Sequence, residues 1–287
     1  MINSLFLVLT VCTLSLQHIC KKIYSGKLDG KAVMLFSTFS SLAAALFFIF
    51  QIKIPFAMDV KVLPYSLLFG LGYGSAVIFS VLAIACGSLS LTALISSYSL
   101  IIPTLYGLIF KGDEISLFLI VGILLLMVSL FLINFVNEKK SSCKITLKWI
   151  MFVALSFIGN GLCSTVQNVQ IADFGGEFKN EFMTVALLFV VVALFIVSLF
   201  TERDCISVAV KKGSLPIIIC GLANGACNLL VMILASRLPA SVMYPLVSAG
   251  SIILTYFISR FFYKEKLSTM QNTGFLLGVL SVVFLNL

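Results

Sequence analysis

The chain has 287 residues, of which 61% are hydrophobic and only 10% are charged, and its mean hydropathy is +1.17. A soluble domain carries about 25% charged residues, so this composition excludes an ordinary soluble protein. The formal net charge of +8 does not indicate nucleic-acid binding, because the basic residues are dispersed among short loops and form no patch or tail. We therefore expect no nucleic-acid partner.

Long uncharged stretches predict membrane-spanning helices. The 49 residues from Val62 to Phe110 contain no charged side chain, which is too long a stretch for one span and sufficient for two. About 20 apolar residues in a helix cross a hydrocarbon layer of about 30 Å, and backbone groups in lipid must be bonded within the segment. This reasoning predicts an all-α membrane protein of ten transmembrane helices, at residues 2–20, 32–51, 64–85, 89–110, 115–136, 149–171, 182–200, 214–236, 239–262 and 267–286.

The distribution of Lys and Arg predicts the orientation of the chain in the membrane. Loops that follow the odd-numbered predicted helices, counted together with Arg260 at the end of the ninth helix, hold 14 of the 19 Lys and Arg residues. Because positive residues collect on the cytoplasmic side, these loops are expected to be cytoplasmic and both termini extracytoplasmic. We expect a multi-pass integral protein of a bacterial-type plasma membrane.

The sequence repeats itself at a spacing near 151 residues. The segment GLGYG at 70–74 aligns with GLANG at 221–225, and FKGDEIS at 110–116 aligns with FYKEKLS at 262–268. In the first helix of each half, Gln17 falls on Gln167 at a spacing of 150. Similarity at a fixed spacing indicates that one structural unit is used twice.

This repeat divides the chain into two five-helix halves. We expect a first repeat at residues 1–138, a cytoplasmic linker at 139–148 and a second repeat at 149–287. Because five is an odd number, the second repeat must be inserted upside down relative to the first. Inverted repeats are typical of secondary transporters, whose binding site lies near the bilayer midplane between the repeats.

Uncharged polar side chains inside the predicted helices mark a candidate site. Such groups are costly in lipid unless they face the bundle interior or a wet cavity. Hydroxyl groups can equally serve close helix packing, so both interpretations stay open for Ser and Thr. Carboxamides need more partners, which favours cavity lining. The predicted substrate-binding residues are Gln17, Tyr73, Ser96, Asn160, Gln167, Asn224, Tyr244 and Ser248.

The sequence contains no pattern that indicates an enzyme, a metal site or a cofactor. The eight cysteines form no CxxC pair, and neither an HExxH motif nor a GxxxxGK[ST] loop occurs. No carboxylate lies within a predicted helix, as an exporter of cationic drugs would need. No Lys or Arg lies at the depth that a carrier of sugar phosphates would need. We therefore expect no catalytic residues, no metal and no cofactor.

Two related runs resemble a known family. They are ASRLPASVMYPLVSAG…FFYKEKLSTMQNTGFLLGV (235–279) and its first-half counterpart GSLSLTALISSYSLIIP…FKGDEISLFLIVG (87–122), and they resemble the EamA type of the drug/metabolite transporter superfamily. The usual Gly-Glu dipeptide of that family is replaced here by Gly112-Asp113 and Lys264-Glu265. The resemblance implies a ten-helix transporter whose pathway is lined by its first, third, fourth, sixth, eighth and ninth helices. Many members have cytoplasmic termini, whereas the Lys and Arg distribution places both termini outside.

These observations predict a secondary transporter that moves a small polar, neutral or zwitterionic metabolite by alternating access through a central cavity between the repeats. The alternative is a lipid-linked carrier, a flippase or a non-transporting membrane partner on the same scaffold. The expected partners are a small-molecule substrate and the lipid bilayer. The oligomeric state is left open, with a monomer as one option, as are the substrate's identity, the direction of transport and any coupling ion.

The predicted orientation can be checked with Cys143, which lies in the loop after the fifth predicted helix. If that loop is cytoplasmic, a membrane-impermeant thiol reagent should leave Cys143 unlabelled in intact cells and label it after permeabilisation. Labelling in intact cells would place the loop outside and reverse the orientation.

Overall fold

The computed structural model describes residues 2–28, 31–52, 56–86, 99–112, 116–135, 146–262 and 269–285. Within these ranges the regular elements are all helices, and none is a strand. The α-helices are α1 (Ile2–Lys27), α2 (Val33–Ile49), α3 (Leu63–Cys86), α5 (Ile101–Phe110), α6 (Leu117–Phe135), α7 (Leu147–Asp173), α8 (Lys179–Thr201), α9 (Ile206–Ala235), α10 (Ala240–Phe262) and α11 (Thr269–Leu285). Two 3₁₀ turns, η1 (Val60–Val62) and η3 (Arg203–Cys205), precede α3 and α9.

The helix positions follow the predicted ones closely, with two extensions. α1 continues to Lys27 instead of ending at residue 20, and α9 begins at Ile206 instead of residue 214. In both cases the added turns carry exposed lysines, which a helix leaving the hydrocarbon layer can present to water. The first part of the predicted helix 89–110 and most of the predicted linker lie outside the described residues.

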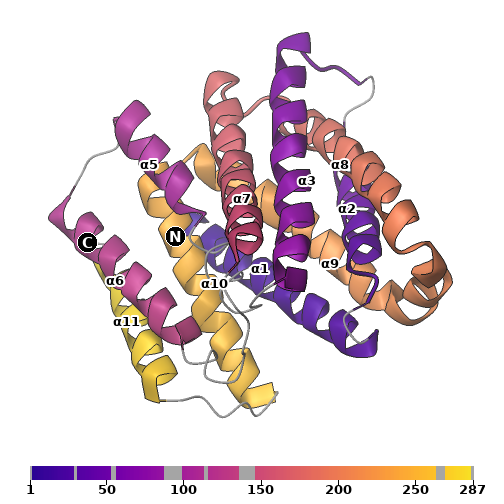
Figure 1. Ribbon diagram of the computed structural model, residues 1–287. Helices are drawn as coiled ribbons and strands as arrows, with labels where there is room; N and C mark the ends of the chain where they lie inside the picture. Colours follow the sequence, from indigo (N-terminus) through magenta and orange to yellow (C-terminus); the bar gives the residue numbers. More distant parts are fainter. Residues whose placement is uncertain are drawn as a thin grey trace.

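The helices form one bundle in which helices far apart in sequence lie side by side (Figure 1). α3 packs along α7, α1 along α9, and α2 against both α8 and α9. α6 and α11 pair at one edge of the bundle, and α10 connects them to α1 and α5. Because most of these pairs join the first half of the chain to the second, the halves are interlocked.

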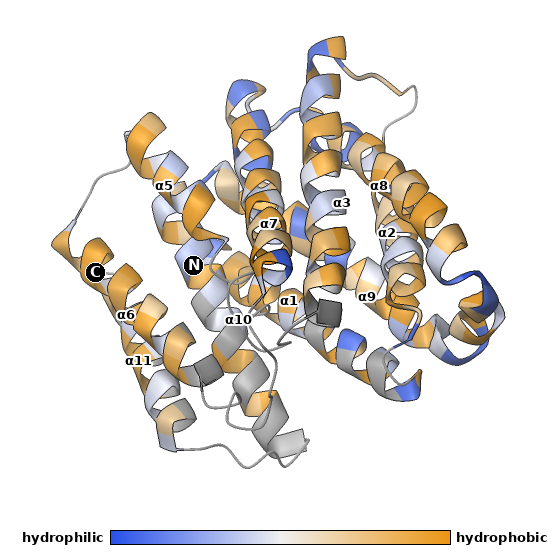
Figure 2. Cartoon of the chain, in the orientation of Figure 1, coloured by the Kyte–Doolittle hydropathy of each residue, from blue (hydrophilic) through white to orange (hydrophobic). Residues whose placement is uncertain are grey.

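The distribution of polar and apolar side chains is that of a protein surrounded by lipid. Ile158, Val192 and Leu71 lie near the middle of their helices and are more than half exposed. On the same bundle, Gln167 and Thr184 are buried. Figure 2 shows that hydrophilic residues gather at helix ends and connections, while the helix shafts are apolar. This arrangement suits a hydrocarbon surround, where an apolar surface costs nothing and an unpaired polar group is expensive.

Five helical stretches in the described ranges are long and apolar enough to cross a membrane. They are Ile2–Lys21, Val60–Ser80, Leu147–Asp173, Lys179–Thr201 and Arg203–Ala235. Shorter apolar helices cover Val33–Ile49, Ile101–Phe110 and Leu117–Ser129. By length and composition, the fold is therefore that of a multi-pass helical membrane protein.

Glycines allow two pairs of helices to approach closely, and the two approaches are alike. A Cβ atom on Gly70 of α3 would lie 2.6 Å from the Phe189 ring and 3.2 Å from the Ala186 carbonyl oxygen on α8. A Cβ atom on Gly221 of α9 would lie 2.4 Å from both the Ala43 Cβ and the Ser40 carbonyl oxygen on α2. Gly221 follows Gly70 by 151 residues, and Ala186 and Phe189 follow Ser40 and Ala43 by 146. The contact that Gly70 makes with α8 is therefore repeated by the contact that Gly221 makes with α2.

The connections after α1 and after α7 share three backbone hydrogen bonds at equivalent positions. In the first, backbone N–H groups of Leu28, Lys31 and Phe36 donate to the carbonyls of residues 24, 28 and 32. In the second, the N–H groups 146 residues later, at 174, 177 and 182, donate to the carbonyls at 170, 174 and 178. The residue before α2, Ala32, has a left-handed φ of 59°, and its counterpart Phe178 has one of 54°.

This register corrects one sequence alignment. The connections and the glycine contacts place the first helices of the two halves at a spacing of 146, so Gln17 corresponds to Cys163 and not to Gln167. The spacing of 150 was one helical turn too long. It was chosen because Gln17 and Gln167 are identical, but the backbone hydrogen bonds follow a spacing of 146.

The N-terminus of α2 is capped from the other half of the chain. The residue before the helix, Ala32, offers no side-chain cap. Instead, the two carboxylate oxygens of Glu202, at the end of α8, accept hydrogen bonds from the N–H groups of Met34 and Leu35 at 3.1 and 2.9 Å. A carboxylate at this position satisfies free N–H groups and complements the helix dipole.

The glycine contacts predict a difference between a closely packed glycine, Gly221 on α9, and an open one, Gly74 on α3. Gly221→Ala should force α9 away from α2 and lower the thermal unfolding midpoint of the detergent-solubilised protein, because the methyl group would overlap backbone atoms. Gly74→Ala is the matched control, since its Cβ would meet nothing within 4 Å. That change should leave the midpoint unchanged or raise it through the helix propensity of Ala, which is about 1 kcal/mol better than that of Gly. Equal midpoints for the two variants would contradict the close approach at Gly221.

Candidate functional site

A hydrogen bond between two equivalent residues joins the halves in the bundle interior. The side-chain N–H of Asn224 on α9 donates to the Tyr73 hydroxyl on α3 at 3.3 Å. The two residues are 151 positions apart and occupy the fourth position of GLGYG and of GLANG. This contact therefore joins a position in one half to its own counterpart in the other, and it consists of two uncharged polar groups.

The network continues from Asn224 to a third helix. Asn228, one turn further along α9, donates to the Asn224 side-chain oxygen at 2.6 Å and to its carbonyl oxygen at 3.0 Å. Gln167 on α7 donates to the Asn228 side-chain and backbone oxygens at 3.4 and 3.3 Å. Gln167 and Asn224 are buried, whereas Tyr73 and Asn228 keep some accessible surface although they lie deep within their helices. The structure therefore connects α3, α9 and α7 through three of the predicted site residues.

The other predicted residues that the structure describes form hydrogen bonds outside this network or are buried on their own helices. The Tyr244 hydroxyl on α10 donates to the Ser164 carbonyl oxygen on α7 at 2.7 Å, and the Asn160 carbonyl oxygen accepts from the Ser164 hydroxyl at 3.3 Å. Ser248 is buried one turn after Tyr244. Gln17 is buried on α1, where it donates to the Thr13 carbonyl oxygen at 3.4 Å. Ser96 lies outside the described residues.

Two residues of this region were not in the predicted set. Asn228 follows Asn224 at a spacing of four, so helical periodicity was a sufficient signal to include it. Ser41 on α2 is fully buried, and its hydroxyl lies close enough to the Tyr73 hydroxyl to interact with it but makes no hydrogen bond of full distance and angle to any described residue. Nothing in the small-residue run around Ser41 distinguishes it from its neighbours in the sequence. A buried hydroxyl without a partner beside a polar network can accept a bond from a ligand or from water.

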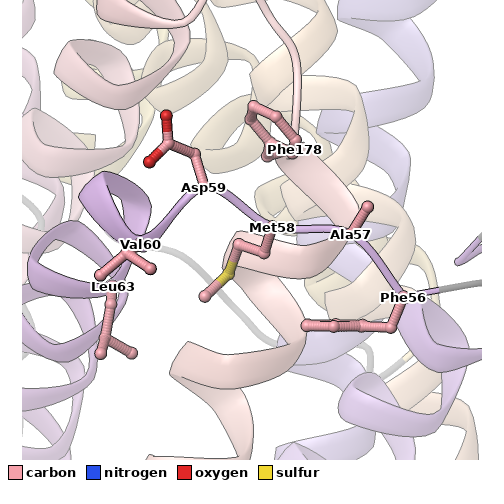
Figure 3. A pocket seen from close by; sticks show the side chains of 7 residues that line it. All are labelled: Phe56, Ala57, Met58, Asp59, Val60, Leu63 and Phe178. Atoms are coloured by element: carbon pink, nitrogen blue, oxygen red, sulfur yellow. The ribbon is translucent and has the colours of Figure 1, made fainter.

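A pocket of about 510 Å³ lies at one end of the bundle, where the chain enters α3 (Figure 3). It is lined by Phe56, Ala57, Met58, Asp59, Val60, Leu63 and Phe178. The Asp59 side chain accepts a hydrogen bond from the Lys61 N–H at 2.9 Å and so caps η1. None of the eight predicted site residues lines this pocket.

A layer of apolar side chains lies between the pocket and the polar network. Met58 and Phe178 pack against it from the pocket, and Tyr73 packs against it from within the bundle. At its centre, the Phe69 ring stacks on Tyr73 at 6.1 Å and meets Phe182 edge-on at 5.6 Å. We call this the Phe69 cluster; its buried members are Ala44, Ala45, Phe48, Val62, Phe69, Cys163, Val166, Ile171, Phe182, Met183, Ala186, Leu187 and Met232.

The fold and this interior define a multi-pass helical membrane protein with an uncharged polar centre. The second half of the chain, residues 147–287, matches the EamA-like transporter family, which places the protein in the drug/metabolite transporter superfamily. The family consists of membrane transporters and not of enzymes. The resemblance seen in the sequence is thereby confirmed.

One solved structure shares the fold over nearly the whole chain. Matches were found to 28 chains, one of which, described only as "Crystal structure of protein", superposes with a TM-score of 0.81. That match covers 99% of this chain and 98% of the other at 10% sequence identity, so it concerns the fold alone. No curated protein matches the sequence.

The contact between Tyr73 and Asn224 predicts a measurable coupling. Tyr73→Phe and Asn224→Ala should each lower the free energy of unfolding, and the double variant should lower it by less than the sum. Hydrogen bonds between membrane helices couple by about 0.6 kcal/mol on average, so the expected coupling is of that order. Unfolding in mixed micelles of dodecyl maltoside and dodecyl sulfate measures it. Strict additivity would mean that the two side chains do not interact.

Proposed function

We propose that the protein is a secondary transporter that moves a small polar, neutral or zwitterionic metabolite by alternating access between two inverted five-helix repeats. The observation that carries this proposal is the Tyr73–Asn224 hydrogen bond, which joins equivalent residues of the two halves inside an uncharged polar network. A substrate held there touches both repeats at once, so its binding can be linked to their relative movement.

Three features support the inverted repeat. The connections after α1 and α7 share their backbone hydrogen bonds at a spacing of 146, and Gly70 and Gly221 meet equivalent partners. The helix contacts also correspond between the halves. α3 packs on α7, and their counterparts α9 and α1 pack on each other. With five helices in each half, the second half crosses the membrane in the opposite direction to the first. The ten spans, both termini outside and a plasma-membrane location remain part of this proposal.

The chemistry of the network supports the substrate class. Gln167, Asn224 and Asn228 offer amide donors and acceptors, and Tyr73 adds a hydroxyl, but none of these groups is charged. A buried anion or cation would need an opposite charge to offset its desolvation, whereas a neutral or zwitterionic molecule can be held by hydrogen bonds. Several modest bonds also allow release, which a carrier requires.

The proposed substrate-binding groups extend beyond the connected network. Tyr244 and Ser248 on α10, Asn160 on α7 and Gln17 on α1 face the same interior from neighbouring helices in this proposal, and Ser41 adds an unpartnered hydroxyl beside Tyr73. Ser96 is proposed on its sequence position alone. Each of these groups is uncharged, in keeping with the substrate class.

A thermal-shift screen against a panel of amino acids, nucleosides and sugars tests the proposed site. A true substrate at about 100 times its Kd should stabilise the protein by about 2.7 kcal/mol. Gln167→Ala and Asn224→Ala should abolish that response, because each removes hydrogen-bonding groups from the network. Gln51→Ala, which removes a carboxamide from the far end of α2, is the matched control and should respond like the parent.

Transport itself is measured by counterflow of each stabilising compound in proteoliposomes. Counterflow in the parent that is lost in both network variants and kept in Gln51→Ala is the expected result. A compound that stabilises all variants equally binds elsewhere. If no member of the panel either binds or exchanges, the proposed substrate class is wrong.

A further inference from the structure

A second apolar cluster closes the opposite end of the bundle from the Phe69 cluster. We call it the Cys220 cluster; its buried members are Cys20, Tyr24, Leu28, Ala32, Leu35, Phe36, Ala209, Ile217 and Cys220. Cys220 lies one turn before Asn224 on α9, as Phe69 lies one turn before Tyr73 on α3. The polar network therefore lies between two apolar layers, one toward each end of the molecule.

The two clusters are built from equivalent positions. Phe36 and Phe182 are separated by 146 residues and are identical. Five further pairs fall at the spacings already found, 146 for α1, α2 and their counterparts and 151 for α3 and its counterpart. These pairs are Cys20 with Val166, Leu28 with Phe174, Ala32 with Phe178, Ala209 with Met58, and Cys220 with Phe69.

In all five pairs the larger side chain either belongs to the Phe69 cluster, as Val166 and Phe69 do, or packs against it, as Met58, Phe174 and Phe178 do. The aromatic rings of that cluster also contact one another, as Tyr65 meets Phe174 at 5.7 Å and Phe174 meets Phe178 at 6.2 Å. The counterparts of Phe174 and Phe178 are Leu28 and Ala32, which bring no such rings. Among the described residues, separating the Phe69 cluster and the rings packed on it would therefore expose more apolar surface than separating the Cys220 cluster, and the free-energy cost rises with that surface.

Tyr24 is a large side chain in the otherwise smaller Cys220 cluster, and it contacts several members of that cluster. Tyr24 fills the space beside Gly213, whose Cβ would lie 2.3 Å from the Tyr24 ring, and its ring lies 4.5 Å from that of Phe36. The Tyr24 hydroxyl donates to the Ala32 carbonyl oxygen at 3.0 Å. Burial, with smaller contributions from Glu202 and Cys205, raises the pKa of Tyr24 to about 12, so this donor keeps its proton at neutral pH.

We propose that the two clusters are unequal gates of the transport pathway, and that the Cys220 cluster is the one that opens more readily. This inference rests on the proposed transport function, because a gate has a purpose only if the polar network receives a substrate. It adds a direction to that function: the resting protein samples opening toward the end where α1 ends and α2 begins. Tyr24 is the residue that limits this opening.

Native cysteines allow a test without a substrate and without mutation. Cys20 and Cys220 belong to the smaller cluster and are 3% and 2% exposed, while Cys163 belongs to the Phe69 cluster and is 6% exposed. By exposure alone, Cys20 and Cys220 should therefore not react faster than Cys163. Purified protein in liposomes is treated with N-ethylmaleimide, and the labelling rate at each cysteine is followed by peptide mass spectrometry. Because buried thiols react only when their surroundings open, we expect Cys20 and Cys220 to be labelled roughly tenfold faster than Cys163.

Two variants separate opening from the intrinsic reactivity of each thiol. Tyr24→Ala should speed the labelling of Cys20 and Cys220 and leave Cys163 unchanged. Phe174→Ala, the matched change in the other cluster, should speed Cys163 alone. Labelling that rises at all three cysteines in either variant would indicate general loosening and would count against separate gates.

Hydrogen–deuterium exchange of the unmodified protein provides a measurement that does not depend on thiols or on variant folding. Peptides covering residues 24–36 should exchange faster than peptides covering residues 170–182. The proposal is overturned if Cys163 is labelled as fast as Cys20 and Cys220 and the two regions exchange equally. Such a result would leave the proposed transport function standing if counterflow is observed. Unequal opening in a protein that transports nothing would instead count against the function.

Discussion

A polar group surrounded by hydrocarbon has no water to bond with, and this constraint organises the whole molecule. It requires the backbone to be helical wherever it crosses the bilayer, and it sends carboxamides and hydroxyls to the interior. There they bond to one another across helices, as Asn224 does with Tyr73 and Gln167 does with Asn228. The outward faces are left to large apolar side chains such as Val192. The hydrocarbon environment alone would therefore gather polar side chains in the interior, whether or not they bind a ligand.

The proposed inverted repeat accounts for the apolar layers on the two sides of that centre. Gly70 and Gly221 meet partners at equivalent positions, and an apolar layer beside the polar centre in one half therefore has a counterpart in the other. The two layers have diverged in size, with Phe69 in one and Cys220 in the other. Divergence of this kind changes the relative stability of the two closed ends without changing the backbone that both halves share.

The sequence predicted the elements well because the signal for a membrane helix is long and local. The helix positions followed from runs of apolar residues, and the 151-residue spacing that relates Tyr73 to Asn224 followed from the segments GLGYG and GLANG. The alignment of Gln17 with Gln167 was wrong. It relied on the identity of the two residues, whereas the connection after the helix sets a spacing that is one helical turn shorter. Ser41 could not be recognised, since its significance lies in a hydroxyl left without a partner by the packing of other helices.

The cap that Glu202 provides for α2 has a consequence for biosynthesis. The carboxylate follows the Met34 N–H by 168 residues, so α2 is made and inserted long before its partner leaves the ribosome. Until then the first turn of α2 has two N–H groups without their final acceptor. The N-terminus of α2 therefore acquires its final hydrogen bonds only when the second half of the chain is in place.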